Sequence, residues 1–194
     1  MENTRDIGAR QTRCIPGEFK TRDEDGSQYI EGYFAVFNSI YEIGDGMTES
    51  IDEHAFDGAL ADDIRCLTNH DTTLVLGRST AKTLELSVDS HGLYGRVLIN
   101  PNDQDALNTK ARVDRGDVTQ ASFGFDILDE NTDYREDGSI HWTIKKVKLY
   151  EVSVCTFPAY KETNLKSRAE QRDEIRARKL EAWKQEQKGK LKEC

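Results

Sequence analysis

Three residues of this sequence could together perform acyl transfer: His70, Ser122 and Glu151. A serine becomes a nucleophile when a neighbouring base takes its proton, and an imidazole is the commonest base. A carboxylate on the second ring nitrogen fixes the tautomer of that imidazole and stabilises the cation that forms. The three residue types predict a hydrolytic site if the fold gathers them. The alternative is structural, with a loop histidine, a small strand serine and a half-exposed strand acid.

The sequence around these residues predicts strands that could bring them together. Residues 64–68 form an expected strand that delivers His70 at its end. Residues 121–127 alternate between apolar and small or polar side chains, so Ser122 is expected to face away from the aromatic packing face. Glu151 lies inside a final expected strand over residues 147–155.

Most of the other elements also favour antiparallel β structure. An aromatic and β-branched run predicts a strand over residues 29–37. Strict alternation on either side of a turn predicts a hairpin over residues 84–99. Two helices are expected, an amphipathic one over residues 52–60 and another over residues 103–115 with Gly116 at its C-terminal end.

Length and charge limit the class of protein. With 194 residues and 22.1 kDa, the chain holds one domain and at most an appendage. The formal net charge is −9, but residues 161–194 carry 11 Lys/Arg and 7 Asp/Glu, which leaves −13 on residues 1–160. An acidic body repels a phosphate backbone, so no nucleic-acid partner is expected for it. No apolar run predicts a membrane span or a secretory signal, so we expect no membrane partner and no export.

Changes in composition along the chain divide it into three segments. We predict an N-terminal polar segment over residues 1–27, which includes a loop or an edge element, and a β domain over residues 28–160. A basic C-terminal helical tail follows over residues 161–194, where Ser167 and Glu170 have the spacing of a capping box.

The four cysteines do not form a recognisable motif. Cys14, Cys66, Cys155 and Cys194 are far apart, without a CxxC spacing and without a histidine grouped beside them. The spacing supports neither a zinc site nor a disulfide framework, so no metal and no other cofactor is expected. Cys66 and Cys155 are interpreted as reduced, buried thiols.

A series of short motifs runs along most of the chain. The motifs are Gly32-Tyr33-Phe34-Ala35-Val36-Phe37-Asn38, Ala55-Phe56-Asp57, Asn69-His70-Asp71, Leu76-Gly77-Arg78, Gly92-Leu93, Arg115-Gly116-Asp117-Val118, Ser122-Phe123-Gly124-Phe125, Glu151-Val152-Ser153-Val154 and Pro158-Ala159-Tyr160. In their order and spacing they resemble those of the tailed-phage prohead maturation proteases, a family similar in fold to the herpesvirus assemblins. Ala121 and His54 depart from residues common in the family, and neither departure removes a catalytic group.

The resemblance implies a mainly β fold, an assemblin-like β-barrel with flanking helices. It also implies a serine endopeptidase that cleaves the scaffolding segment of the major capsid protein, and commonly itself, inside an immature capsid. His70 would be the base, Ser122 the nucleophile and Glu151 the third member of the triad. Such enzymes need no cofactor, and self-association as a dimer is expected. The location would be the interior of the prohead in the host cytoplasm, or the bacterial cytoplasm for a prophage.

Some alternatives remain open at the level of sequence. Asp71 competes with Glu151 for the third position, although as the neighbour of His70 it would have to curl back. Ser153 is a rival nucleophile. The loop over residues 115–117 is a candidate for the oxyanion hole by chain proximity. His91 and His141 are interpreted as structural. The rival functions are a catalytically silent capsid or scaffold component and a hydrolase of small esters, although the latter lacks a GxSxG elbow.

Overall fold

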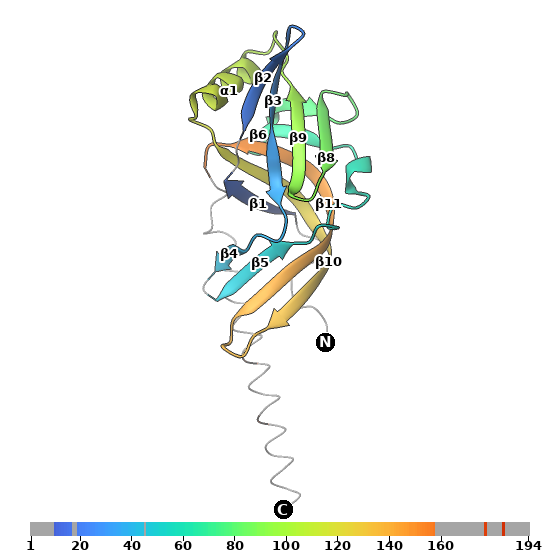
Figure 1. Cartoon of the computed structure of the whole chain (residues 1–194), viewed down its shortest axis with the longest axis vertical. Helices are drawn as coiled ribbons and strands as arrows, with labels where there is room; N and C mark the ends of the chain where they lie inside the picture. Colours follow the sequence, from blue (N-terminus) through green and yellow to red (C-terminus); the bar gives the residue numbers. More distant parts are fainter. Residues whose placement is uncertain (1–9, 17–18, 45, 158–176, 178–183, 185–194) are drawn as a thin grey trace, which may run out of the picture.

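The computed structural model describes residues 10–16, 19–44, 46–157, 177 and 184. Most of the predicted C-terminal helical tail therefore lies outside the described residues. Within them, two β-sheets and one α-helix form the body (Figure 1). No helix of the described part is long and apolar enough to cross a membrane.

The larger sheet contains seven strands and carries the candidate site. Its order is β1–β10–β11–β5–β4, and β6 pairs with both β11 and β7. Its first strand belongs to the segment predicted as polar and N-terminal, and it forms an edge of the sheet. The strands are β1 (Gln11–Pro16), β4 (Tyr41–Gly44), β5 (Met47–Ile51), β6 (Arg65–Thr68), β7 (Asp71–Arg78), β10 (Gln120–Tyr134) and β11 (Ile140–Cys155).

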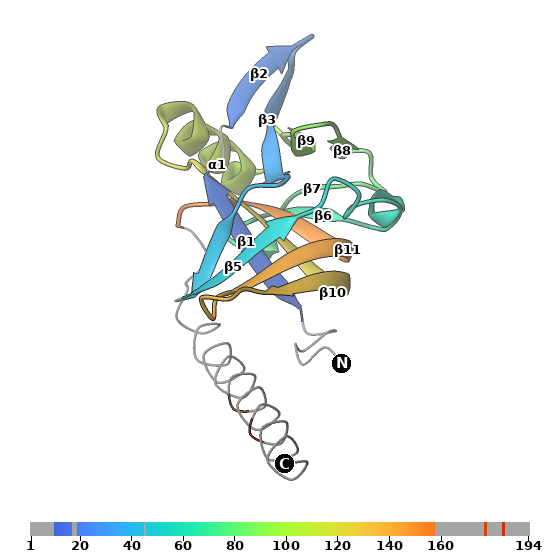
Figure 2. The same cartoon turned by 60° about the horizontal axis from the view of Figure 1, so that its bottom comes forward.

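The smaller sheet has the order β2–β3–β9–β8. It contains the two predicted elements at residues 29–37 and 84–99, and both are confirmed. In Figures 1 and 2 the helix lies beside β2, on the side away from β8 and β9. Its strands are β2 (Lys20–Glu24), β3 (Ser27–Val36), β8 (Leu84–Val88) and β9 (Gly92–Leu98).

The two halves of β11 have different neighbours. One edge of β11 pairs with β10 along nearly its whole length. The other edge pairs in parallel with β5 over residues 140–144 and with β6 over residues 151–154. The final strand expected over residues 147–155 is thus the second part of a longer strand, because β11 is continuous from Ile140 to Cys155 (Figure 1).

The mainly β class is confirmed, but the two sheets do not close into the barrel that the resemblance implied. The smaller sheet ends at β2 and β8, and no strand pairing joins it to the larger sheet among the described residues. The two sheets instead share one hydrophobic core, in which β3 packs against β1 and β10. Phe34 and Phe123 are completely buried there. Side-chain packing rather than a continuous ladder of hydrogen bonds holds the sheets together.

The helix expected over residues 52–60 is not an α-helix. Backbone N–H groups there donate to carbonyls three residues back, as in turns, and only the short 3-10 helix η1 (Ala59–Ala61) forms. Gly58 has a φ of 80°, which breaks a helix, and the Ala55 carbonyl accepts from Val147 N on β11. Ala55 and Phe56 are nevertheless buried, so the pattern identified the core face correctly.

The second expected helix is confirmed as α1 (Gln104–Arg115). The Asp103 carboxylate caps its start by accepting from the backbone N–H groups of Asp105 and Ala106. Gly116 ends the helix with a φ of 81°, the left-handed conformation that glycine adopts without strain.

Candidate active site

The candidate site lies on one face of β1, β10 and β11. Directly opposed residues of antiparallel strands point to the same face of a sheet. Cys14 on β1 is opposite Ser122 on β10, and Ser122 is opposite Ser153 on β11. Gly124 is opposite Glu151 in the same way. The predicted serine and the predicted carboxylate therefore share a face, while Phe123 between them points into the core.

The turn between β6 and β7 places His70 over this face. Thr68 pairs with Asp71, which leaves Asn69 and His70 as a two-residue hairpin turn, with φ of 53° and 61°. Left-handed φ at both central positions is typical of the tight turns that suit a hairpin. Positive φ is uncommon for histidine, and such strain is often found at functional sites.

Several hydrogen bonds fasten this turn to the end of β11 and to the residue that follows it. The Asn69 N–H donates to the Val154 carbonyl at 3.0 Å, and the Asn69 carboxamide oxygen accepts from Thr156 N at 2.8 Å. The backbone N–H of His70 donates to Ser153 Oγ at 3.3 Å. The imidazole is therefore held in place by its own backbone and not only by contacts of its ring.

The His70 ring contacts the predicted carboxylate. His70 Nδ1 lies 2.6 Å from Glu151 Oε1, and the other carboxylate oxygen accepts from Ser153 Oγ, also at 2.6 Å. Glu151 is 6% exposed, and Ser153 is completely buried. Because both carboxylate oxygens are engaged, the orientation of the carboxyl group is fixed.

The second nitrogen of the ring has no such partner. His70 Nε2 is buried and makes no hydrogen bond within the described part of the chain. The same is true of Ser122 Oγ, on a residue that is fully buried. Buried polar atoms are almost always hydrogen-bonded, so two exceptions on one sheet face call for an explanation.

The charge environment of His70 favours its protonated form. Burial acts to lower the pKa of His70, but contacts with the Cys14 thiol and the Glu151 carboxylate act in the opposite direction and outweigh it, so that the pKa rises to about 9. An imidazole stabilised as a cation is suited to hold a proton taken from a serine.

Gly124 makes room for the carboxylate, and the sequence analysis did not assign it a role. A Cβ atom at this position would lie 2.4 Å from Glu151 Oε1, the oxygen that contacts His70. Any larger residue would displace that oxygen. The signal that could have identified Gly124 is a glycine directly opposite a buried acid, which is visible only once the register of the strands is known.

Two predicted alternatives lie elsewhere. The Asp71 carboxylate accepts from the backbone N–H and the hydroxyl of Thr73, and it is exposed. It therefore serves the first residues of β7, and its oxygens are not among the groups that contact His70. In the 115–117 loop, the N–H groups of Gly116 and Asp117 donate to carbonyls of α1. These two groups are not available to an oxyanion in this conformation.

The thiols are placed differently from what their spacing in the sequence indicated. Cys66 and Cys155 are buried, as predicted. Cys14 and Cys155, however, both lie beside His70, and the ligand atoms of the three residues are all within 4.8 Å of one another. The fold thus brings together a histidine and two cysteines that are far apart in the sequence.

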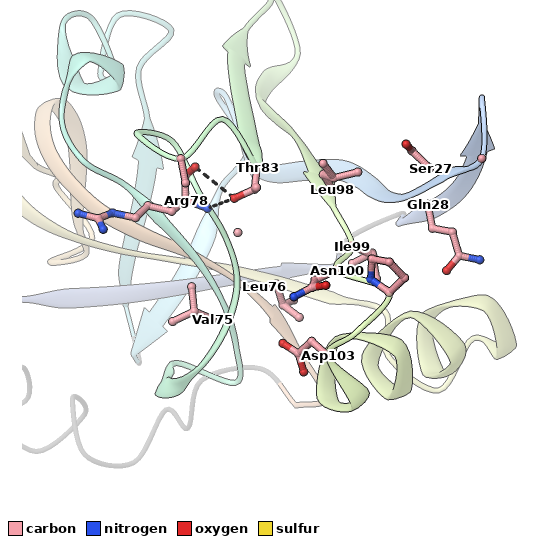
Figure 3. A pocket seen from close by; sticks show the side chains of 14 residues that line it. Ser27, Gln28, Val75, Leu76, Arg78, Thr83, Leu98, Ile99, Asn100 and Asp103 are labelled. Carbon is pink, nitrogen blue, oxygen red and sulfur yellow. Dashed lines mark hydrogen bonds between the residues drawn. The ribbon is translucent and has the colours of Figure 1, made fainter.

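A separate pocket of about 810 Å³ lies between β7, the β8–β9 hairpin and the start of α1 (Figure 3). Val75, Leu98 and Asp103 are among its lining residues, and the Arg78 backbone N–H donates to Thr83 Oγ1 at its edge. None of the three predicted catalytic residues is part of its lining, so the candidate site is not this pocket.

The fold and the site together define a mainly β protein that gathers a serine, an imidazole and a buried carboxylate on one sheet face. Comparison with known proteins agrees with this description. The sequence model of the caudovirus prohead serine proteases matches residues 17–178, and the chain belongs to this family.

Individual relatives have related names. The chain is 34% identical over 146 residues to the prohead protease of Enterobacteria phage HK97, a match that covers 73% of this chain and 60% of that protein. The chain thus spans less than two thirds of the length of this relative. A solved structure, that of the bacteriophage T4 capsid assembly protease, aligns over 76% of this chain and 96% of that chain, with a TM-score of 0.48 and 14% identity.

Proposed function

We propose that this chain is a serine endopeptidase of phage head maturation, with Ser122 as nucleophile, His70 as general base and Glu151 as the residue that orients the base. The observation that carries the proposal is the 2.6 Å contact between His70 Nδ1 and Glu151 Oε1, on the face that bears Ser122. Membership of the prohead serine protease family supports the coarser statement that the chain is a serine protease.

In the proposed reaction, Ser122 Oγ attacks the scissile carbonyl and its proton passes to His70 Nε2. Glu151 stabilises the imidazolium through Nδ1, and the imidazolium then protonates the leaving amine. Water, with His70 again as base, releases the acyl group from Ser122. These steps need neither a metal nor an organic cofactor.

The environments of the two serines favour Ser122 over Ser153 as the nucleophile. Ser153 Oγ donates its proton to Glu151 and accepts from the His70 backbone, so both of its functions are used in the structure of the site. Ser122 Oγ has no partner among the described residues, as expected for a group that donates to Nε2 only when the site is engaged. Catalytic hydrogen bonds are often incomplete before substrate binds.

The complete burial of Ser122 points to a latent enzyme. A peptide can reach its hydroxyl only after the atoms around it move aside. We propose that this movement accompanies assembly, and that the protein acts inside the prohead in the host cytoplasm or, for a prophage, in the bacterial cytoplasm. The proposed substrates are the scaffolding segment of the major capsid protein and the chain itself, with a homodimer as the active form.

The test is intact mass over time for wild type and for Ser122→Ala, alone and mixed with the matching capsid precursor. We expect wild type to cleave the precursor, and Ser122→Ala to leave it whole. Ser153→Ala is the matched variant, in which some cleavage should persist because the nucleophile remains. Equal cleavage by wild type and Ser122→Ala would refute the assignment of Ser122. Intact precursor with every variant in co-assembled proheads would favour the silent structural component.

A further inference from the structure

Two thiols and one imidazole form a compact cluster at the candidate site. Cys14 lies on β1, His70 lies in the β6–β7 turn, and Cys155 is the last residue of β11. Their ligand atoms all lie within 4.8 Å of one another. Ser122 lies on β10, the strand between β1 and β11, and its side chain is on the same face as the cluster.

This set of donors suits a thiophilic divalent ion. Zinc binds thiolate sulfur at about 2.3 Å and imidazole nitrogen at about 2.0 Å in a tetrahedral arrangement. Donor atoms of one tetrahedron are then about 3.5–3.8 Å apart, a spacing that small side-chain rotations can produce from a cluster this tight. Magnesium and calcium prefer oxygen donors, so two sulfurs and a nitrogen select against them.

His70 already has the contacts of a metal-binding histidine. Such residues commonly use one ring nitrogen for the ion and donate the other N–H to a carboxylate, which fixes the ring and makes it a better ligand. In His70 the Nδ1 atom contacts Glu151, and Nε2 is buried without a hydrogen bond from the described residues. An ion at Nε2 would give this unsatisfied atom a partner.

The site is also reachable. The His70 side chain is 26% exposed and Cys14 is partly exposed, whereas Cys155 is buried at the base of the cluster. An ion could enter from the side of His70 and Cys14. Three protein ligands leave a fourth position for water or for a nearby hydroxyl.

We propose that Cys14, His70 and Cys155 bind Zn²⁺, and that the bound ion reversibly inhibits the protease. Binding forms two Zn–S bonds and one Zn–N bond and releases one proton from each thiol to solvent, without any redox change. Because the ion occupies His70 Nε2, that nitrogen cannot accept the proton of Ser122. The inhibitory half of this inference rests on the proposed function, whereas the binding half does not.

The binding half is tested with Co²⁺ and Zn²⁺ on the full chain carrying Ser122→Ala, which cannot digest itself under the proposed mechanism. Tetrahedral cobalt–thiolate sites absorb strongly in the near ultraviolet and in the visible. We expect that absorption, its displacement by Zn²⁺ and a calorimetric stoichiometry of one ion per chain. Cys14→Ser and Cys155→Ser should each weaken the thiolate band, because one of the two sulfurs remains, and weaken binding at least tenfold.

The matched control removes the two other thiols, Cys66→Ala with Cys194→Ser, and should keep the full cobalt spectrum. Absence of the thiolate band in the Ser122→Ala chain would overturn the inference. So would a band that persists in the double variant Cys14→Ser/Cys155→Ser, since the ion would then be bound elsewhere.

The inhibitory half is tested on the active chain with its capsid precursor. Equimolar Zn²⁺ should suppress cleavage at least tenfold and a chelator should restore it, while the Cys66→Ala/Cys194→Ser variant responds in the same way. Cobalt binding without any proteolysis under chelation in co-assembled proheads would refute the proposed function and leave the metal site standing. Proteolysis that is insensitive to Zn²⁺ in a chain that binds it would refute the inhibitory role.

Discussion

A histidine lies near each end of β11, and the two imidazoles differ in whether their ring nitrogens have hydrogen-bond partners. Near its start, His141 has both ring nitrogens satisfied, Nδ1 by Thr48 Oγ1 at 2.8 Å and Nε2 by Ser50 Oγ at 3.0 Å. Near its end, His70 is held over the strand with one nitrogen on Glu151 and the other without a partner. Burial, assisted by the charge of Arg135, lowers the pKa of His141, whereas that of His70 is raised.

The same contrast applies to the carboxylates. Glu49 beside the first end is completely buried and forms a bidentate ion pair with Arg13, so its charge is compensated within the fold. Glu151 at the other end faces a histidine and a serine, both of which can exchange protons. A satisfied buried network stabilises one structure, whereas a network with open positions leaves capacity for chemistry. Four experiments test this difference in behaviour.

The largest effect is expected from His70→Gln. Loss of the base should lower turnover of the capsid precursor by a factor on the order of 10⁴, because triad members act as a unit. His141→Gln is the matched variant and should retain turnover close to that of wild type. Quantified precursor cleavage measures both. Equal losses in the two variants would show that the ends of β11 do not differ in function.

Glu49→Ala should instead affect stability. Removing Glu49 leaves the buried guanidinium of Arg13 without its counter-charge, which typically costs about 3–5 kcal/mol. Urea unfolding of the Ser122→Ala chain measures the change. Glu42→Ala, at an exposed position of β4, is the control and should stay within about 0.5 kcal/mol of its parent. A similarly small change for Glu49→Ala would mean that the ion pair contributes little.

Two glycine substitutions should separate activity from stability. In Gly124→Ala the new methyl group meets the flexible tip of Glu151, so the carboxylate moves and turnover should fall about 100-fold with little change in stability. In Gly95→Ala the methyl group meets the buried Phe34 ring at 2.5 Å, so stability should fall by about 1–3 kcal/mol. Cleavage assays and urea unfolding test the pair, and a reversal of the two outcomes would contradict the assignment.

The smallest effect concerns protonation. In the Ser122→Ala chain with a chelator present, NMR titration should give His70 a midpoint near pH 9 and His141 a midpoint below its usual range. Below its midpoint His70 is charged and cannot accept a proton, so wild-type turnover should rise with pH up to that value. Glu151→Gln should lower the His70 midpoint, because it removes a negative charge. A His70 midpoint below that of His141 would contradict the comparison.

Local patterns in the sequence were reliable where hydrogen bonds are local. The α1 helix, the β8–β9 hairpin and the orientation of Ser122 away from the core follow from spacings of three to four or of two residues, and all are confirmed. The helix prediction for residues 52–60 was wrong because the backbone N–H of Val147, on a distant strand, donates to the Ala55 carbonyl. No local sequence pattern indicates this competing hydrogen bond.

The mainly β class, the polar face of β10 and the presence of a serine, a histidine and acids suited to acyl transfer could all be predicted from the sequence. The folded chain was needed to show that Glu151 rather than Asp71 contacts His70 and that Gly124 makes room for this carboxylate. It was also needed to show that Cys14 and Cys155 lie beside the same ring. The reason is that these contacts depend on the register of β1, β10 and β11 and on the β6–β7 turn. Register across strands far apart in the chain is set by packing of the whole core, and a shift of one residue would turn each of these side chains to the other face.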